Sequence, residues 1–252
     1  MQAGKRRIQG GFTVVELMVA LLIGLFLLGG LLTLVQDNRR SFASQNQLSQ
    51  LQDAERMAMT MITDVIQSAG YFPDPTTNSA TLVLPANGTF TVAGQAIVGT
   101  PGAGPPGDTI SVRYATNSGD GIVNCIGQSN TSGGVATYTN SFSVANGQLV
   151  CTMNGKAYSI IGTVPSASGN FTGVVVTNMS ILYGVTTGSS PNNVDTYYSA
   201  GAVPNWSNVI SVQVTLTFTN PMYTTQAQAQ GSTVPPTLSF QRVITVMSQA
   251  GI

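Results

Sequence analysis

The feature that most constrains this chain is an uncharged, apolar run near its N-terminus. Residues 17–36 contain no Asp, Glu, Lys or Arg and only two polar side chains. About 20 apolar residues, each rising 1.5 Å along a helix, are needed to cross the roughly 30 Å core of a bilayer. The basic cluster Lys5, Arg6 and Arg7 precedes the run and favours a cytoplasmic N-terminal end. The run therefore predicts one membrane-spanning helix.

Three interpretations of this segment compete. A cleaved secretory signal peptide fits badly, because its apolar region spans about 7–15 residues, and no small-residue cleavage site follows Val35. A plain signal anchor fits the hydropathy but leaves Glu16 unexplained, since an ionisable group in a spanning helix is costly and usually functional. The third interpretation is that residues 11–16, Gly-Phe-Thr-Val-Val-Glu, form a processing site, which gives Glu16 a role.

Residues 11–16 resemble the site at which prepilin peptidase cuts type IV pilins and the pseudopilins of type II secretion. The resemblance implies cleavage between Gly11 and Phe12 on the cytoplasmic side, followed by N-methylation of Phe12. Glu16 then becomes the fifth residue of the mature chain. The new α-amine can pair with Glu16 of a neighbouring subunit in a filament, and a charge removed from water needs such a partner.

The helix is expected to continue beyond the membrane. From residue 37 the composition turns polar, yet apolar residues recur every three or four positions, which is typical of an amphipathic helix. Gly70 and Pro73 are expected to end it. The apolar stripe consists of Leu48, Leu51, Ala54, Ala58, Met61, Ile62, Val65, Ile66 and Ala69. The predicted segments are a leader (1–11), a transmembrane or filament-core helix (12–36), its amphipathic continuation (37–70) and a globular head (71–252).

Three glycines lie inside the apolar run, at Gly24, Gly29 and Gly30. Each costs about 1 kcal/mol relative to Ala in a helix interior. One interpretation is that they let neighbouring helices approach closely or let the segment stretch. The alternative is that glycine is simply common in membrane helices.

Residues 71–252 have the pattern of a β-rich head. The clearest strand is 208–218, where apolar and polar residues alternate strictly, as in an antiparallel sheet with one face buried on a helix. Further strands are expected over 109–114, 174–183 and 240–247, with long loops such as 93–107 and 223–236 between them. The predicted fold class is α+β: a long N-terminal helix packed on an antiparallel β-rich head with long loops, similar to a type IV pilin.

Cys125 and Cys151 are the two cysteines of the chain. If the head lies outside the cytoplasm, as the predicted topology requires, they should be oxidised to each other. Two free structural thiols are the alternative.

The composition argues against several classes of function. The chain has no His, which excludes His-dependent nucleophile systems and His-ligated zinc or haem sites. Nine basic and nine acidic residues give zero net charge, which argues against a nucleic-acid-binding groove. Segments 117–121 and 192–195 suggest calcium loops but lack the necessary carboxylates, so ordinary turns are expected. We expect no enzymatic activity, no catalytic or metal site, no cofactor and no nucleic-acid partner.

The C-terminal half resembles a more specific family. Residues 175–185 and 203–209 look like the C-terminal signature of the PilW family, minor pilins of type IV pili in Gram-negative bacteria. Asp64, Ile66, the run Ala69-Gly70-Tyr71 and the spacing of the two cysteines are also similar to that family. Gln213 and residues 248–252 depart from it, because basic residues are expected at both places.

The resemblance implies a role in pilus assembly and twitching motility. It implies a helix in the inner membrane with a cytoplasmic N-terminus and a periplasmic head, and a later place in the pilus, at its tip. Expected partners are other minor and major pilins, contacted through the N-terminal helix, and prepilin peptidase; a tip adhesin is a further candidate. The nearest rival is a J-type minor pseudopilin of type II secretion. A second rival is a membrane-anchored adhesive β-domain without a filament role.

Overall fold

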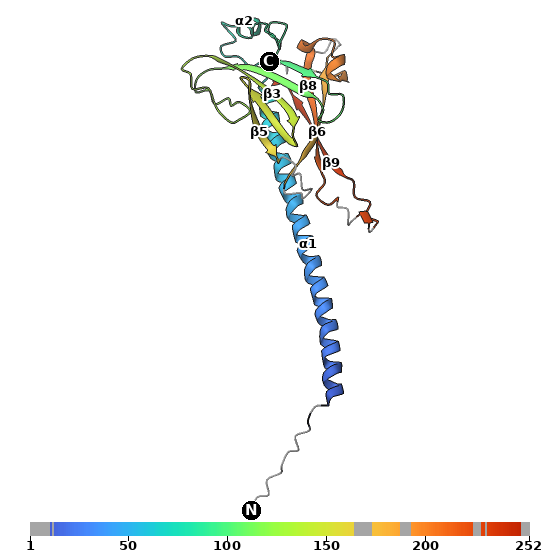
Figure 1. The fold of residues 1–252 in the computed structure, drawn as a ribbon. Helices are drawn as coiled ribbons and strands as arrows, with labels where there is room; N and C mark the ends of the chain where they lie inside the picture. Colours follow the sequence, from blue (N-terminus) through green and yellow to red (C-terminus); the bar gives the residue numbers. More distant parts are fainter. Residues whose placement is uncertain are drawn as a thin grey trace, which may run out of the picture. The chain divides into compact units, whose positions relative to one another are not determined.

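The computed structural model describes residues 11, 13–163, 173–186, 193–223, 228–229 and 231–247. The chain divides into two compact units, residues 1–46 and 47–252, which are described separately. Helix α1 (Val14–Gln67, 54 residues) contributes to both (Figure 1). The predicted continuation of the apolar helix beyond residue 36, toward an end at Gly70, is therefore confirmed.

In the first unit, no described residue covers the large apolar side chains of α1, which are exposed. Its Leu-rich sequence has a high helix propensity, and Thr13 stands just before its first turn. A Cβ added at any of the three glycines of the apolar run, Gly24, Gly29 or Gly30, would meet nothing within 4 Å. All three are thus places where another chain could approach the backbone closely.

In the second unit, one face of α1 is buried in the head. The side chains of Leu51, Ala58, Ile62, Val65 and Ile66 are at most 2% exposed, which confirms the predicted apolar stripe. Met59 joins them, whereas Leu48, Ala54 and Met61 are only half-buried.

The helix ends where the sequence predicts. Gly70 has a φ of 75°, in the left-handed region that glycine adopts without strain. The N–H of Tyr71 donates to the carbonyl of Ser68, and the N–H of Gly70 donates to the carbonyl of Arg113, both at 3.0 Å. The second bond ties the end of α1 to a strand of the head.

A five-stranded antiparallel sheet follows, in the order β1-β2-β3-β4-β5. Its strands are β1 (Ile97–Thr100), β2 (Thr109–Thr116), β3 (Ala136–Ala145), β4 (Gln148–Met153) and β5 (Lys156–Gly162). Two tight hairpins join the last three strands. Their turns are Asn146-Gly147 and Asn154-Gly155, where all four residues have φ between 51° and 77°. Asn-Gly with positive φ at both positions is the preferred two-residue hairpin turn.

A four-stranded antiparallel sheet has the order β7-β6-β8-β9. Its strands are β6 (Val176–Val185), β7 (Thr196–Tyr198), β8 (Val209–Thr219) and β9 (Thr237–Thr245). Outside the two sheets, the head contains the short helices α2 (Ala80–Val83), η1 (Ala200–Ala202) and η2 (Trp206–Asn208). In β8 the predicted alternation of buried and more exposed side chains holds from Val212 to Thr219. It fails at Ser211, which is predicted to face solvent but is buried like the residues on either side of it. The α1 face and both sheets share one hydrophobic core.

Of the nine strands in the described residues, four match the sequence prediction and five do not. β2, β6, β8 and β9 lie within three residues of their predicted starts and ends. β1, β3, β4, β5 and β7 were not predicted, and the expected loop 93–107 is wrong where it contains β1. Ser, Thr and Asn make up half or more of β3, so its apolar alternation is weak, although the two Asn-Gly turns beside β4 were a usable signal.

Arg113 on β2 organises the segment that leads from α1 into the first sheet. The side chain is 1% exposed, and its guanidinium donates to the backbone carbonyls of Leu84, Pro85, Val92 and Gln95. Burial lowers the pKa of the Arg113 guanidinium from its usual value, but an Arg side chain stays protonated in a protein. A buried cation is thus satisfied by four carbonyls of one loop.

Candidate assembly site on the N-terminal helix

The first turn of α1 determines the surroundings of Glu16. The Oγ1 atom of Thr13 accepts a hydrogen bond from the backbone N–H of Glu16 at 3.3 Å. Thr and Glu at this spacing occupy the N-cap and third positions of a capping box. The Glu16 side chain is exposed and lies in the first turn, where the positive end of the helix dipole stabilises a negative charge. The helix start therefore carries one exposed carboxylate, and its pairing with a neighbouring subunit remains a prediction.

The predicted processing site is only partly described. Gly11 is exposed, and a Cβ added there would meet nothing within 4 Å. Phe12 and the basic cluster Lys5, Arg6 and Arg7 lie outside the described residues. Cleavage after Gly11 and methylation of Phe12 remain predictions.

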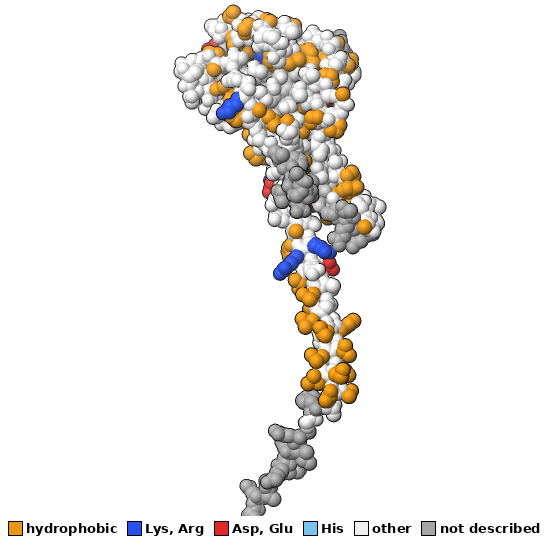
Figure 2. Space-filling view, in the orientation of Figure 1, with side chains coloured by type: hydrophobic (Ala, Val, Ile, Leu, Met, Phe, Trp, Pro, Cys, Tyr) orange, Lys and Arg blue, Asp and Glu red, His pale blue; other side chains and the backbone are white. Residues whose placement is uncertain are grey.

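The helix between Val14 and Val35 carries a continuous apolar surface. Its large hydrophobic side chains are 47% to 84% exposed, with Phe26 the most exposed, and Figure 2 shows hydrophobic side chains covering this stretch. Soluble monomers rarely expose contiguous apolar patches above about 300–600 Å². Helix α1 is also long and apolar enough to cross a membrane. A surface of this kind needs lipid or other apolar helices around it.

Charges mark both ends of this surface. Glu16 stands at its start and Asp37 just beyond its end, 21 residues later, which corresponds to about 31 Å along a helix. Arg40 lies 4.0 Å from Asp37, and both side chains are more than 60% exposed. An exposed pair of this kind contributes at most about 1 kcal/mol. The spacing matches the thickness of a bilayer core.

Cys125 and Cys151 form a disulfide in the head, with 6.4 Å between their Cα atoms. The bond ties the β2–β3 connection to β4. The N–H of Cys125 also donates to Oδ1 of Asn140 at 3.0 Å, and the hydroxyl of Tyr114 donates to the carbonyl of Val123 at 2.7 Å. The connection is therefore held by one covalent bond and by two neighbouring strands.

The turn at residues 117–121 uses its carboxylate internally. Oδ1 of Asp120 accepts from the Thr116 hydroxyl at 2.6 Å and the Ile122 N–H at 3.0 Å, and Oδ2 accepts from the Asn117 N–H at 2.8 Å. Asp120 thus closes the turn, as the sequence predicts. The second candidate, 192–195, is described only from residue 193 onward.

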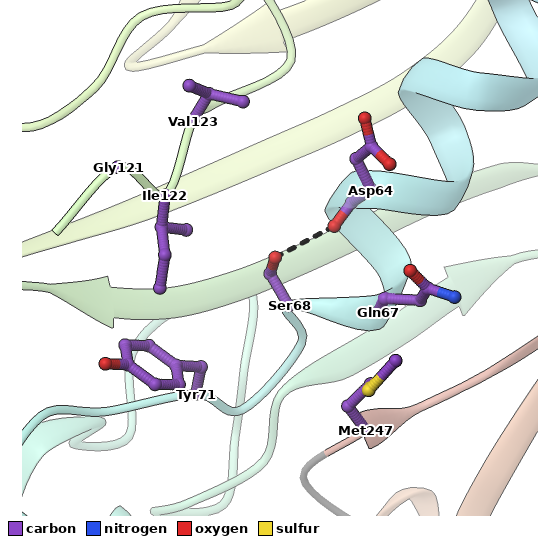
Figure 3. Close-up of a pocket in the computed structure, with 8 residues that line it drawn as sticks. All are labelled: Asp64, Gln67, Ser68, Tyr71, Gly121, Ile122, Val123 and Met247. Carbon is purple, nitrogen blue, oxygen red and sulfur yellow. Dashed lines mark hydrogen bonds between the residues drawn. The ribbon is translucent and has the colours of Figure 1, made fainter.

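A groove of about 460 Å³ opens beside the end of α1, within the second unit. Figure 3 shows Tyr71 and Ile122 approaching each other on one side, with Met247 on the other. The Ser68 hydroxyl donates to the carbonyl of Asp64 at 2.8 Å. The lining residues are Asp64, Gln67, Ser68, Tyr71, Gly121, Ile122, Val123 and Met247. They come from three separated segments, so sequence reasoning did not bring them together.

Two family models match the chain. The model of Type IV Pilus-assembly protein W (PilW) matches residues 129–247, and the model of the prokaryotic N-terminal methylation motif matches residues 6–32. The comparison with curated proteins gives no match.

Two solved structures resemble the chain. One is a type IV-like pilin from Thermus thermophilus, with a TM-score of 0.43 and 12% identity, covering 80% of this chain and 99% of that one. The other belongs to the GspK-GspI-GspJ complex of the type 2 secretion system of enterotoxigenic Escherichia coli. Its TM-score is 0.37 at 12% identity, and the match covers 78% of this chain and 97% of that one.

The two family matches fall on the parts of the structure described above. The methylation motif spans the capped start of α1, including Gly11 and Glu16, and the PilW match spans β3 to β9 of the head. The match to a pilus protein favours the pilus over type II secretion, and it indicates a structural protein that interacts with other pilins. The PilW match over the head and the methylation motif at the N-terminus together support a membrane-anchored minor pilin of type IV pilus assembly, of the PilW family.

Proposed function

We propose that this minor pilin acts in a complex of minor pilins that primes pilus growth and afterwards lies at the pilus tip. The complex forms in the inner membrane of a Gram-negative bacterium, with the N-terminus of the chain in the cytoplasm and the head in the periplasm. Prepilin peptidase cuts after Gly11, and Phe12 becomes the methylated N-terminus. A tip adhesin is a further partner of the assembled complex.

The exposed apolar stretch of α1, which starts with a single carboxylate, is the observation that carries this proposal. Glu16 is the one ionisable residue between Gly11 and Gln36. A subunit can leave the bilayer only if its helix enters surroundings of similar polarity, and a bundle of pilin helices supplies them. The same helix serves as membrane anchor and as filament core.

Glu16 sets the register of that bundle. Removing an isolated carboxylate from water costs several kcal/mol unless an opposite charge compensates it. The α-amine created at Phe12 of a neighbouring subunit is a cation of the right kind. Because the pair forms at one axial offset only, it selects one arrangement of adjacent helices.

The test is a chromosomal replacement of Glu16 by Ala or Gln, with Asp37→Asn as the matched control. Both acids are exposed and lie at opposite ends of the apolar stretch. We expect both Glu16 variants to insert into the membrane but to leave cells without surface pili in electron micrographs. Asp37→Asn should give wild-type numbers, and antibody against the wild-type head should label pilus tips. Normal piliation with Glu16→Ala would contradict the proposal.

A further inference from the structure

The outer side of β9 is an open sheet edge. β9 is the last strand in the order β7-β6-β8-β9, and no described strand pairs with its other side (Figure 1). The backbone hydrogen bonds between β9 and β8 use the even-numbered residues of β9. The N–H of Val246 donates to the carbonyl of Ile210, and the N–H of Asn220 donates to the carbonyl of Pro236, so the register places every second residue of β9 in such a bond. The backbone N–H and C=O groups of the odd-numbered residues therefore point away from the sheet. These residues are Thr237, Ser239, Gln241, Val243 and Thr245.

This edge lacks most of the features by which proteins protect their sheet edges. Short strands, Lys, Pro, bulges and inward-pointing charged side chains are the usual means, and of these β9 has one inward-pointing charge, Arg242. β9 is nine residues long, contains no Lys or Pro, and pairs with β8 without a register shift. All five odd-numbered side chains are exposed and uncharged, and Val243 is 52% exposed. An open edge of this length is a template for another strand.

The other three sheet edges of the described head are protected. β7 has three residues, and β1 has four and lies beside η1 and η2. β5 begins with Lys156, whose ammonium lies 5.1 Å from the ring centre of Tyr158, and its ladder to β4 contains a register shift. The contrast within one molecule singles out β9.

Arg242 on β9 is a cation that an added strand could pair with a carboxylate. Its side chain lies on the half-buried side of β9, and its guanidinium donates one long hydrogen bond, 3.4 Å, to the hydroxyl of Thr63 on α1. No described carboxylate lies within 4.0 Å of it. A strand added beside β9 would place its own side chains next to Arg242, so a carboxylate at that position would complete an ion pair.

We propose that β9 accepts an extended strand of another pilin, which becomes the fifth strand of this sheet and carries a carboxylate opposite Arg242. The inference rests on the proposed minor-pilin complex and names the surface by which this head joins it. The backbone groups provide the hydrogen bonds, and the apolar residues of the added strand lie beside Phe240 and Ile244. Met247, two residues beyond β9, lines the groove at the end of α1 and extends this contact.

A second copy of this chain does not fit the edge. The added strand has to bring a carboxylate to Arg242, and β9 itself contains no Asp or Glu. A second β9 strand paired with this edge would therefore leave the charge of Arg242 without an opposite charge. The occupant is therefore a different pilin.

The test uses the full chain in mild detergent together with the other full-length minor pilins of the same pilus system. Residue-resolved amide exchange is measured with and without them. We expect the amides of residues 239, 241, 243 and 245 to exchange at least ten times more slowly in the complex. A complex that leaves these four amides unprotected would overturn the inference and leave the proposed function standing. Absence of any complex would contradict the proposed function, and this inference with it.

Variants of Gln241 provide the second measurement. Gln241→Pro removes one outward N–H without removing a bond to β8, whereas Gln241→Thr keeps it. We expect Gln241→Pro to raise the dissociation constant at least tenfold and Gln241→Thr to change it less than twofold. Arg242→Ala should also weaken binding. Equal affinities for the wild type, Gln241→Pro and Arg242→Ala would overturn the inference, and the fluorescence of Trp206 reports whether each head is folded.

Discussion

Replacing Arg113 by Met should strongly destabilise the head, because the arginine is buried and its partners form one loop. Of its four hydrogen bonds, those to the carbonyls of Gln95 (2.6 Å) and Leu84 (3.1 Å) are buried. A hydrogen bond with a charged donor contributes about 1.5–3 kcal/mol, so these two alone give about 3–6 kcal/mol. The guanidinium also lies 4.4 Å from the ring centre of Phe90. The loss is a large part of the total stability of an ordinary domain, about 5–15 kcal/mol.

The assay is urea unfolding of the full chain in mild detergent, followed by the fluorescence of Trp206, the one tryptophan of the chain. Trp206 packs edge-on against the ring of Tyr183, with 4.8 Å between ring centres, and so reports on the core of the head. Arg113→Lys should lower the free energy of unfolding by about half as much as Arg113→Met, since an ammonium cannot reach all four carbonyls. Arg242→Met is the control and should cost less than about 1 kcal/mol. A loss below about 1 kcal/mol for Arg113→Met would refute the reasoning.

Three further predictions concern the head. Tyr183→Phe should leave the free energy of unfolding unchanged or raise it by about 1 kcal/mol in the same urea assay, because the buried Tyr183 hydroxyl has no hydrogen-bond partner among the described residues. A loss of more than about 1 kcal/mol would show that the hydroxyl has a partner. Replacing both Cys125 and Cys151 by Ser should lower the free energy of unfolding by about 3.5 kcal/mol, the chain-entropy value for a 26-residue loop, and an unchanged urea midpoint would contradict this. Burial raises the pKa of Tyr114 from 10.0 to about 12. The folded state therefore keeps this proton when the unfolded state has lost it, and stability should fall between pH 10 and 12 by up to about 2.7 kcal/mol. Melting temperatures across this range should fall less steeply in Tyr114→Phe, whereas Tyr71→Phe, which removes an exposed phenol, should behave as the wild type.

The parts of the fold that follow from local periodicity were predictable. The apolar run and the stripe ending at Gly70 predict α1, and the alternation of β8 predicts a strand with one buried face. Both patterns repeat within a few residues, so neighbouring positions carry the information. The polar strands β3 to β5 have no such pattern and depend on pairing with each other, although Asn146-Gly147 and Asn154-Gly155 mark their turns.

The candidate site was predictable only where its chemistry lies in one continuous segment. Glu16 and its flanking residues form a local motif, and the structure adds the hydrogen bond from the Glu16 N–H to Thr13. The four hydrogen bonds of the Arg113 guanidinium were not predictable from the sequence. Their acceptors are backbone carbonyls 18 to 29 residues away, and every residue type has such a carbonyl. The open edge of β9 likewise depends on the strand order, which no single strand encodes.

The mature N-terminus tests the central claim most directly. The measurement is mass spectrometry of the full protein from membranes of cells with and without active prepilin peptidase. The account predicts a chain that begins with N-methylated Phe12 when the peptidase is active and retains residues 1–11 when it is absent. A chain that begins at Met1 in both membranes, or one cut beyond Val35, would contradict the assignment to pilus assembly.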